Sequence, residues 1–404
     1  MISSDLTREL FVTGSGARIL LLVIDGLGGL PHPATGLSEL ETAALPNLDR
    51  LCGRSSCGLH SPLGPGFTPG SGPAHLALFG YDPWLRRIGR GALSCLGLGL
   101  DFRPGDVAAR LNFCTVDGDG RVSDRRAGRI PTETCRRLCG LLADVDIPGV
   151  EVTVAPEMEY RAAVRFRGEG LSDGVGDSDP QVTGRPPLPL RAESADDRRM
   201  AAVAESFVAR AGELLAGESP ANMVLIRGFG SYPELPSMQD VYGLDPVGLA
   251  GYPMYRGIAR AVGMDTPGCD ARIDAQLDLL EARWQAGPED FWYVHFKPTD
   301  SAGEDGDFDR KVSLLEEMDG HLPRLLDLKP EVLVVTGDHS TPSRMGGHSW
   351  HPVPVLILGE AGFPVAGTRM TERGCAGGSL GRIATTELMA LALAHAGRLA
   401  KFGA

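Results

Sequence analysis

The 404-residue sequence has few cysteines and no long apolar run. Its eight cysteines include no CxxC pair, which argues against a disulfide framework or a paired-cysteine metal site, and we expect the thiols to be reduced. No stretch approaches the roughly 18 consecutive apolar residues that a membrane-spanning helix needs. The N-terminal segment MISSDLTREL carries charges where a secretory signal needs an apolar run, so we expect a cytoplasmic protein.

Positive charge is also scarce. The chain has 39 lysines and arginines against 52 aspartates and glutamates, which gives a net charge of −13. Nucleic acid and anionic membrane surfaces require a broad basic footprint, so we expect neither as a partner. A small anionic ligand stays compatible with this charge, provided that arginines and metal ions are concentrated in a cleft.

Three glycine-rich stretches resemble familiar motifs, but each lacks a residue that the motif requires. DGLGGLP has Pro31 in place of the third glycine of a dinucleotide fingerprint. GPGFTPGSGPAH lacks the lysine of a P-loop and the G-x-S-x-G spacing of a hydrolase elbow. EDGDFDRKVSLLE has Arg310 where a calcium-binding loop needs glycine. These three functions are therefore excluded.

Buried strands are the clearest elements that the sequence does contain. Residues 18–24 form a nearly continuous apolar run that ends at Asp25, and the runs at 331–340 and 352–359 are similar. This pattern predicts a mainly parallel α/β sheet with its site at the carboxyl ends of the strands. The expected helices are 46–52, 272–285, 309–326 and 383–399.

The middle of the chain has a different texture. Residues 104–238 combine extended segments with polar turns and one expected helix at 197–216, which is typical of an α+β insertion. A chain of this length is too long for one ordinary core. We therefore predict a core formed by residues 1–103 and 239–404, interrupted by an inserted domain at 104–238.

Metal-binding residue types follow the apolar strands. Alone, each has a simpler explanation, because serines often cap helices and acids often end strands. Mixed aspartates and histidines suit Zn²⁺ or Mn²⁺, and seven such groups are enough for two ions. Ser71 opens an apolar segment, so it is a candidate nucleophile at a helix N-terminus. The seven groups are Asp25, Ser71, Asp300, Glu304, Asp338, His339 and His348.

Five ordered blocks indicate a family. The blocks are VIDGLGG, PGSGPAHLALFGYDP, DRRAGRI, TDSAGEDGDF and VTGDHSTP with HSWHPVPVLILG. Together they resemble the archaeal-type cofactor-independent phosphoglycerate mutases of the alkaline phosphatase superfamily. The resemblance implies an alkaline-phosphatase-like three-layer core with a substrate-binding insertion. It also implies interconversion of 3-phosphoglycerate and 2-phosphoglycerate through a phosphoserine, without 2,3-bisphosphoglycerate.

The resemblance also implies a role for each matching residue. One metal ion would be bound by Asp25, Ser71, Asp338 and His339, and the second by Asp300, Glu304 and His348. Lys297 and Arg227 would act with Ser71 in phosphoryl transfer. The substrate, a small phosphorylated acid, would be bound by Asp124, Arg125, Arg129 and His75.

Two positions depart from the family pattern. Glu304 stands where the family usually has histidine. Gly72 and Pro73 stand where many relatives have Asp-Thr, so His75 or a water would take over the proton transfer that is assigned to that aspartate.

Two other functions stay open. One is a phosphatase or phosphotransferase for another phosphorylated or phosphonylated hydroxy acid, and the other is an inactive metal-binding regulatory protein. A monomer and a homo-oligomer are both compatible with the sequence.

Overall fold

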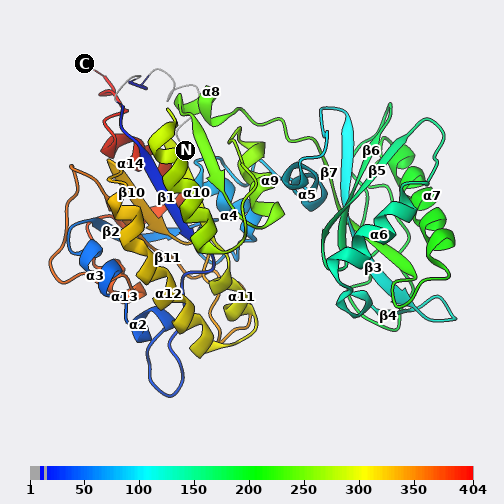
Figure 1. The fold of residues 1–404 in the computed structure, drawn as a ribbon, viewed down its shortest axis with the longest axis horizontal. Coiled ribbons are helices and arrows are strands. Elements are labelled where there is room, and N and C mark those ends of the chain that lie inside the picture. Colours follow the sequence, from blue (N-terminus) through cyan, green and yellow to red (C-terminus); the bar gives the residue numbers. More distant parts are fainter. Residues whose placement is uncertain (1–9, 13–15, 404) are drawn as a thin grey trace. The chain divides into compact units, whose positions relative to one another are not determined.

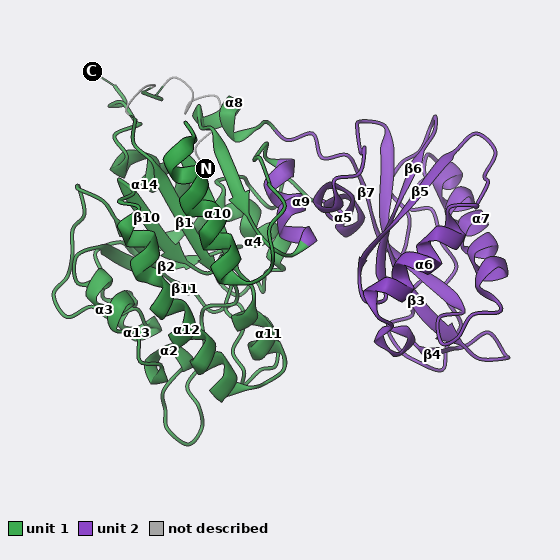
Figure 2. Cartoon of the chain, viewed as in Figure 1, with its two compact units in different colours: residues 1–87, 236–252, 262–404 green, residues 88–235, 253–261 purple. Residues whose placement is uncertain are grey.

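The computed structural model describes residues 10–12 and 16–403. The expectation that the N-terminus is no export signal rests mainly on residues 1–9, which lie outside the described residues. The chain forms two compact units, which Figure 2 shows in different colours. Among the described residues, unit 1 comprises residues 10–12, 16–87, 236–252 and 262–403, and unit 2 comprises residues 88–235 and 253–261.

Unit 1 is built on a sheet that has seven strands among the described residues. The strand order is β12-β2-β11-β10-β1-β9-β8, and only β11 runs against the others. The strands are β1 (Ile19–Ile24), β2 (Ser56–Ser61), β8 (Pro246–Leu249), β9 (Phe291–Phe296), β10 (Val332–Thr336), β11 (Val353–Leu358) and β12 (Gly381–Ala384). The predicted mainly parallel α/β sheet is thus confirmed.

Helices cover both faces of this sheet (Figure 1). On one face, Leu20, Leu22 and Ile24 of β1 share one apolar cluster with a first group of four helices. On the opposite face, Phe79 at the end of α4 packs edge-on against Tyr293 of β9, with ring centroids 5.1 Å apart. The first group is α2 (Glu39–Thr42), α3 (Pro46–Cys52), α10 (Ile273–Ala286) and α12 (Phe308–Asp327), and the second includes α4 (Ser71–Leu78) and α14 (Leu388–His395).

Two local predictions need correction. The expected helix at 383–399 begins too early, because residues 383 and 384 pair with β2 as part of β12, and α14 starts only at Leu388. The expected strand at 352–359 exists as β11, but it is antiparallel to β10. Residues 337–352, which connect these two strands, contain no helix, and a parallel return would need a crossover that is usually helical.

Unit 2 has an antiparallel sheet of five strands among the described residues, with β3 (Asp106–Val116) between β7 (Met223–Ser231) on one side and β6 (Arg161–Arg167) on the other. β4 (Val122–Asp124) and β5 (Glu151–Met158) complete it. One face packs against α6 (Thr132–Leu142) and α7 (Arg198–Leu215). The predicted helix at 197–216 corresponds to α7.

The opposite face of the unit 2 sheet packs against α5 (Arg90–Leu98), and α9 (Pro253–Ala261) packs in turn against α5. A Cβ on Gly91 of α5 would lie 2.3 Å from the Cα of Ala109 in β3, so α5 lies directly on the sheet. The unit therefore begins at Ile88, whereas the sequence placed the insertion from residue 104.

In unit 1 the 3₁₀ helix η2 (Thr385–Glu387) precedes α14, and three further α-helices are short. They are α8 (Met238–Tyr242), α11 (Pro298–Glu304) and α13 (Glu372–Ala376). Within the described residues, no helix combines the length and the apolar character that crossing a membrane requires.

Candidate active site

Three neighbouring strands end at the same edge of the unit 1 sheet. Asp25 follows β1 directly, Lys297 follows β9 directly, and Asp338 lies two residues after β10. These strands are adjacent and parallel, so their carboxyl ends coincide (Figure 1). The loops after β1 and β10 are also joined, because the Thr341 N–H donates to the carbonyl oxygens of Gly26 and Gly28 at 3.3 and 3.1 Å.

The first candidate metal group consists of Asp25, Asp338 and His339, whose side chains are all fully buried. Their ligand atoms lie within 4.8 Å of one another. His339 Nε2 lies 3.1 Å from Asp338 Oδ2 and 3.5 Å from Asp25 Oδ1. Ser71 Oγ lies 3.3 Å from the same nitrogen, so the four side chains assigned to one ion converge on one point.

Ser71 is placed by the start of α4. It is the first residue of the helix, and Gly70 before it has an extended backbone. The apolar segment that follows, Ala74 to Leu78, is buried and fixes the helix in unit 1, while Ser71 itself stays partly exposed. The hydroxyl therefore lies at a helix N-terminus, where backbone N–H groups favour an anion such as phosphate.

The second candidate group consists of Asp300, His339 and His348. His348 Nε2 lies 3.5 Å from Asp300 Oδ1 and 3.7 Å from Glu304 Oε1. The rings of His339 and His348 stack with centroids 3.7 Å apart, so the two groups are contiguous. Asp300 is buried, whereas 54% of the Glu304 side chain is exposed at the end of α11. The role of Glu304 as a ligand stays a prediction.

Lys297 connects the two groups. Its Nζ lies 3.4 Å from Asp25 Oδ2 and donates to Asp300 Oδ2. Burial tends to lower the pKa of Lys297, but Asp25 and Asp300 outweigh it and raise this pKa. The side chain is therefore a fixed positive charge, and it remains partly exposed at the mouth of the site.

The electrostatics of the first group fit a cation. Burial tends to raise the pKa of Asp25, yet Lys297, His295 and His339 hold it well below its usual value. Burial and Asp25 also raise the pKa of Asp338, but His339 and His75 bring it below the usual value. Two ionised carboxylates therefore lie side by side without exposure to water, and burial lowers the pKa of His339, which favours the neutral ligand form. Oxygen and imidazole donors in this mixture fit Zn²⁺ or Mn²⁺.

Two further histidines contact the carboxylates of Asp338 and Asp25. His75, which the sequence places beside the substrate, is fully buried, and its Nδ1 lies 2.9 Å from the Ser71 carbonyl oxygen and 3.3 Å from Asp338 Oδ2. This location favours a positioning role over contact with substrate. His295 was missed by the sequence reasoning, and its Nε2 lies 3.2 Å from Asp25 Oδ2. The only sequence signal for it is a histidine inside the apolar strand FWYVHF.

Arg125, which was predicted to bind substrate, and Arg227, which was predicted to act in phosphoryl transfer, both lie in unit 2, where they share one carboxylate. Arg125 donates to both oxygens of Asp179 at 2.8 and 2.6 Å, and Arg227 Nη1 lies 3.3 Å from Asp179 Oδ2. We call Arg125, Arg227 and Asp179 the arginine group. Sequence reasoning missed Asp179, which lies 54 residues after Arg125 in a loop.

The other two predicted substrate residues belong to the turn beside Arg125. The Asp124 carboxylate accepts from the N–H groups of Arg126 and Gly128 at 2.8 and 2.6 Å, so it fixes the turn. Arg129 ends the turn with a left-handed backbone, at a φ of 53°. Direct contact of either residue with substrate stays a prediction.

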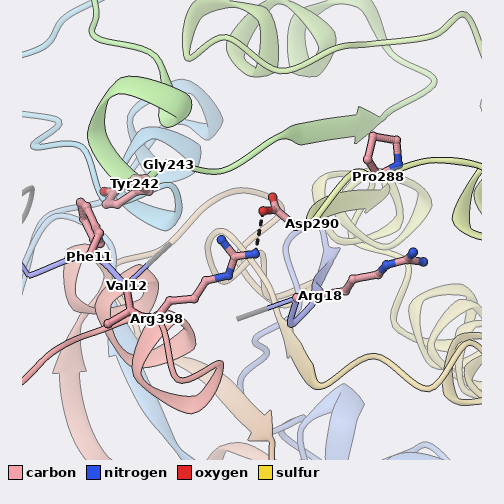
Figure 3. A pocket seen from close by; sticks show the side chains of 9 residues that line it. Phe11, Val12, Arg18, Tyr242, Gly243, Pro288, Asp290 and Arg398 are labelled. Carbon is pink, nitrogen blue, oxygen red and sulfur yellow. Dashed lines mark hydrogen bonds and ion pairs between the residues drawn. The ribbon is translucent and has the colours of Figure 1, made fainter. Parts of the chain in front are cut away.

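A separate pocket of about 270 Å³ lies at the opposite end of β1 (Figure 3). Arg398 points towards Asp290 across it, and the two form an ion pair of 2.6 Å. None of the seven metal-ligand candidates lines this pocket. Its lining residues are Phe11, Val12, Gly16, Arg18, Tyr242, Gly243, Pro288, Asp290 and Arg398.

Comparison with known proteins gives a consistent result. Residues 53–222 match the family model described as 2,3-bisphosphoglycerate-independent phosphoglycerate mutase. A relative from Aquifex aeolicus, named a probable member of that enzyme class, is 48% identical over 99% of this chain and 100% of its own. A relative from Thermus thermophilus with the same name is 49% identical over 96% of each chain.

Two solved structures extend the likeness to the fold. A protein from Pyrococcus horikoshii has a TM-score of 0.81 at 29% identity and covers 96% of this chain and 99% of its own. The cofactor-independent phosphoglycerate mutase from Thermoplasma acidophilum has a TM-score of 0.70 at 29% identity, over 94% of this chain and 100% of its own. With relatives this similar over nearly the full length, the chain belongs to the 2,3-bisphosphoglycerate-independent phosphoglycerate mutase family.

Proposed function

We propose that the protein interconverts 3-phosphoglycerate and 2-phosphoglycerate through a phosphoserine on Ser71. The observation that carries the proposal is the position of the Ser71 hydroxyl, 3.3 Å from His339 Nε2 and beside the buried pair Asp25 and Asp338. A serine in this position can be both a ligand and a nucleophile. The names of the relatives support the same reaction.

The two candidate metal groups would hold two divalent ions, Mn²⁺ or Zn²⁺. Asp25, Ser71, Asp338 and His339 would hold one, and Asp300, His348 and Glu304 the other. Such ions favour the ionised serine and neutralise charge on a transferring phosphoryl group. No 2,3-bisphosphoglycerate is needed, because the serine carries the phosphoryl group between the two positions of glycerate.

The protein side chains perform two displacements. In the first, Ser71 Oγ forms a bond to phosphorus while the bond from phosphorus to the C3 oxygen of the substrate breaks, and the serine proton is transferred to the C3 oxygen, which leaves phosphoserine and glycerate. In the second, the C2 oxygen of the reoriented glycerate attacks phosphorus, the bond from phosphorus to Ser71 Oγ breaks, and the C2 hydroxyl proton returns to Ser71. Lys297 remains charged at the mouth of the site and stabilises negative charge on the phosphoryl oxygens.

The arginine group of unit 2 suits the substrate, which has a phosphate and a carboxylate. Guanidinium groups grip both anions with paired hydrogen bonds. Arg125 and Arg227 each retain partial exposure, at 25% and 22% of the side chain, so both can donate to a ligand. We further propose a cytoplasmic location, because both substrates are phosphorylated glycolytic intermediates.

The test uses purified protein loaded with Mn²⁺ and supplied with 3-phosphoglycerate. We expect ³¹P NMR to show 2-phosphoglycerate, and mass spectrometry after an acid quench to find phosphate on the peptide that contains Ser71. Ser71→Ala should lower turnover by at least about a thousandfold, because the nucleophile is lost. The control, Ser206→Ala, changes an exposed serine of α7 and should have no effect.

The other outcomes contradict the proposal in different ways. Release of inorganic phosphate instead of 2-phosphoglycerate would make the protein a phosphatase. Bound metal without either product would indicate a regulatory protein. Full turnover by Ser71→Ala would rule out the phosphoserine route in every version.

A further inference from the structure

A fully buried lysine lies directly behind the candidate metal site. Of the four lysines, all within the described residues, only Lys311 has no exposed surface. It occupies the apolar face of α12, in line with Leu315, Met318 and Leu322. An amine in such a position is costly unless every donor is paired and the charge is compensated.

All three donors of Lys311 are paired with backbone carbonyl oxygens. Its Nζ donates to Gly26 at 2.8 Å, to Gly28 at 3.0 Å and to Thr341 at 2.8 Å. The first two carbonyls belong to the loop after β1, and the third belongs to the loop after β10. One ammonium therefore joins the two loops that bear Asp25 and His339.

These two loops also carry direct contacts to the ligands. The Gly26 N–H donates to Asp338 Oδ1 at 3.2 Å. The Thr341 hydroxyl donates to Asp300 Oδ1 at 2.6 Å and lies 3.0 Å from His339 Nδ1. A shift of either loop would therefore move ligands in both candidate metal groups.

Two carboxylates compensate the charge of Lys311, of which Glu39 is fully buried and Glu372 partly buried. Burial lowers the pKa of Lys311, and Glu39 and Glu372 are the first two groups that oppose this shift. Both carboxylates are anchored to neighbouring segments. Glu39 accepts from the N–H and hydroxyl of Ser343 at 2.8 and 2.6 Å, and Glu372 accepts from the Gly29 N–H at 2.7 Å.

Three carbonyl oxygens around one charge, with two carboxylates nearby, resemble the surroundings of a bound cation. A methionine would fill a similar volume but would leave the three carbonyls without this donor. The observations thus favour a specific need for an ammonium in this position.

We propose that Lys311 is a positioning residue, whose ammonium acts as a built-in cation that joins the loops after β1 and β10 and so holds the metal ligands ready before any metal binds. The proposal rests on the proposed function only in assuming that divalent ions bind at the two candidate groups. The three hydrogen bonds of Lys311 go to backbone carbonyl oxygens and to none of the candidate ligand side chains.

The first test compares Lys311→Met with Leu315→Ala. Both variants disturb the buried face of α12, but only the first removes the ammonium. Isothermal titration of the metal-free proteins with Mn²⁺ should show about 10–100-fold weaker binding for Lys311→Met, the range for lost supporting contacts at metal sites. Leu315→Ala should bind Mn²⁺ within about twofold of the unaltered protein. Equal affinity of both variants would overturn the proposal.

A chemical rescue separates the ammonium from simple packing. In Lys311→Ala, added propylammonium should restore much of the Mn²⁺ affinity, whereas 1-propanol, which has the same number of heavy atoms and no charge, should not. Rescue by both compounds equally would show that only volume matters, and the proposal would fail.

A measurement on the unaltered protein covers the case in which the variants do not fold. Hydrogen exchange of the Thr341 amide, which donates to the loop after β1, should already be slow in metal-free protein. Fast exchange that slows only after Mn²⁺ is added would overturn the proposal. None of these readouts needs substrate, so failure of the mutase assay and failure of this proposal are distinguishable.

Discussion

The first candidate metal group of unit 1 and the arginine group of unit 2 differ in how firmly they are enclosed. Asp25, Asp338 and His339 have no exposed surface and lie at strand ends. Arg125 and Arg227 keep 25% and 22% of their side chains exposed, and they reach their partner Asp179 from a turn and a strand.

This difference separates two tasks. Bond-making requires ligands that do not move, and closely packed strands supply that stiffness before the reaction starts. Recognition of a substrate that must reorient requires long side chains that can form and release hydrogen bonds. The two regions should therefore respond differently to substitution: losses in unit 1 should appear in kcat, and losses in unit 2 in KM.

The largest effect is expected from Asp338→Asn. The change removes a negative ligand from the buried pair, so metal affinity should fall and kcat should drop by at least about a thousandfold. A chelator added to the unaltered protein should have the same effect, reversed by Mn²⁺. Asp327→Asn, at an exposed position of α12, is the control. Retention of kcat by Asp338→Asn would place the metal site elsewhere.

Substitution of Arg125 should have an intermediate effect. Arg125→Ala should raise KM by about 10–100-fold, because a charge-assisted pair of hydrogen bonds contributes about 1.5–3 kcal/mol. Arg125→Lys keeps the charge but not the paired hydrogen bonds, so its KM should lie between those of the unaltered protein and Arg125→Ala. Steady-state kinetics checks both values. A fall in kcat at constant KM would mean that the arginine group takes part in the transfer step.

The smallest effect is expected from Glu304→His, which restores the residue that the family pattern usually has. Glu304 is half exposed and 3.7 Å from His348, so kcat/KM should change by less than about tenfold. The preference between Mn²⁺ and Zn²⁺ should change more, because imidazole replaces a carboxylate. Activity measured across a titration of each metal checks this. An unchanged preference would show that residue 304 is no ligand.

Much of the unit 1 core was predictable because its signals are local. The run at 18–24 and its terminal Asp25 indicate a buried strand with a polar end, and residues 331–340 repeat this pattern. The order of the motifs then identified the family. Only the structure, however, shows that His339 lies between the two candidate groups.

Long-range contacts could not be predicted. His75 was expected beside the substrate, but its burial depends on how α4 packs on the sheet. Lys311 occupies a helix whose sequence looks like an ordinary amphipathic surface helix, and nothing local shows that its amine meets two loops distant in sequence. The direction of β11 depends on its connection to β10, which a strand pattern does not encode.

The division of unit 1 along the chain has a consequence for biosynthesis. The chain passes between the units after Arg87, Leu235, Tyr252 and Ala261. β1 leaves the ribosome well before its sheet partners, which begin only at Phe291 and Val332. Until β9 and β10 have been synthesised this apolar strand has no final partner, so the nascent protein should depend on chaperone protection and should acquire metal only after β10 has emerged.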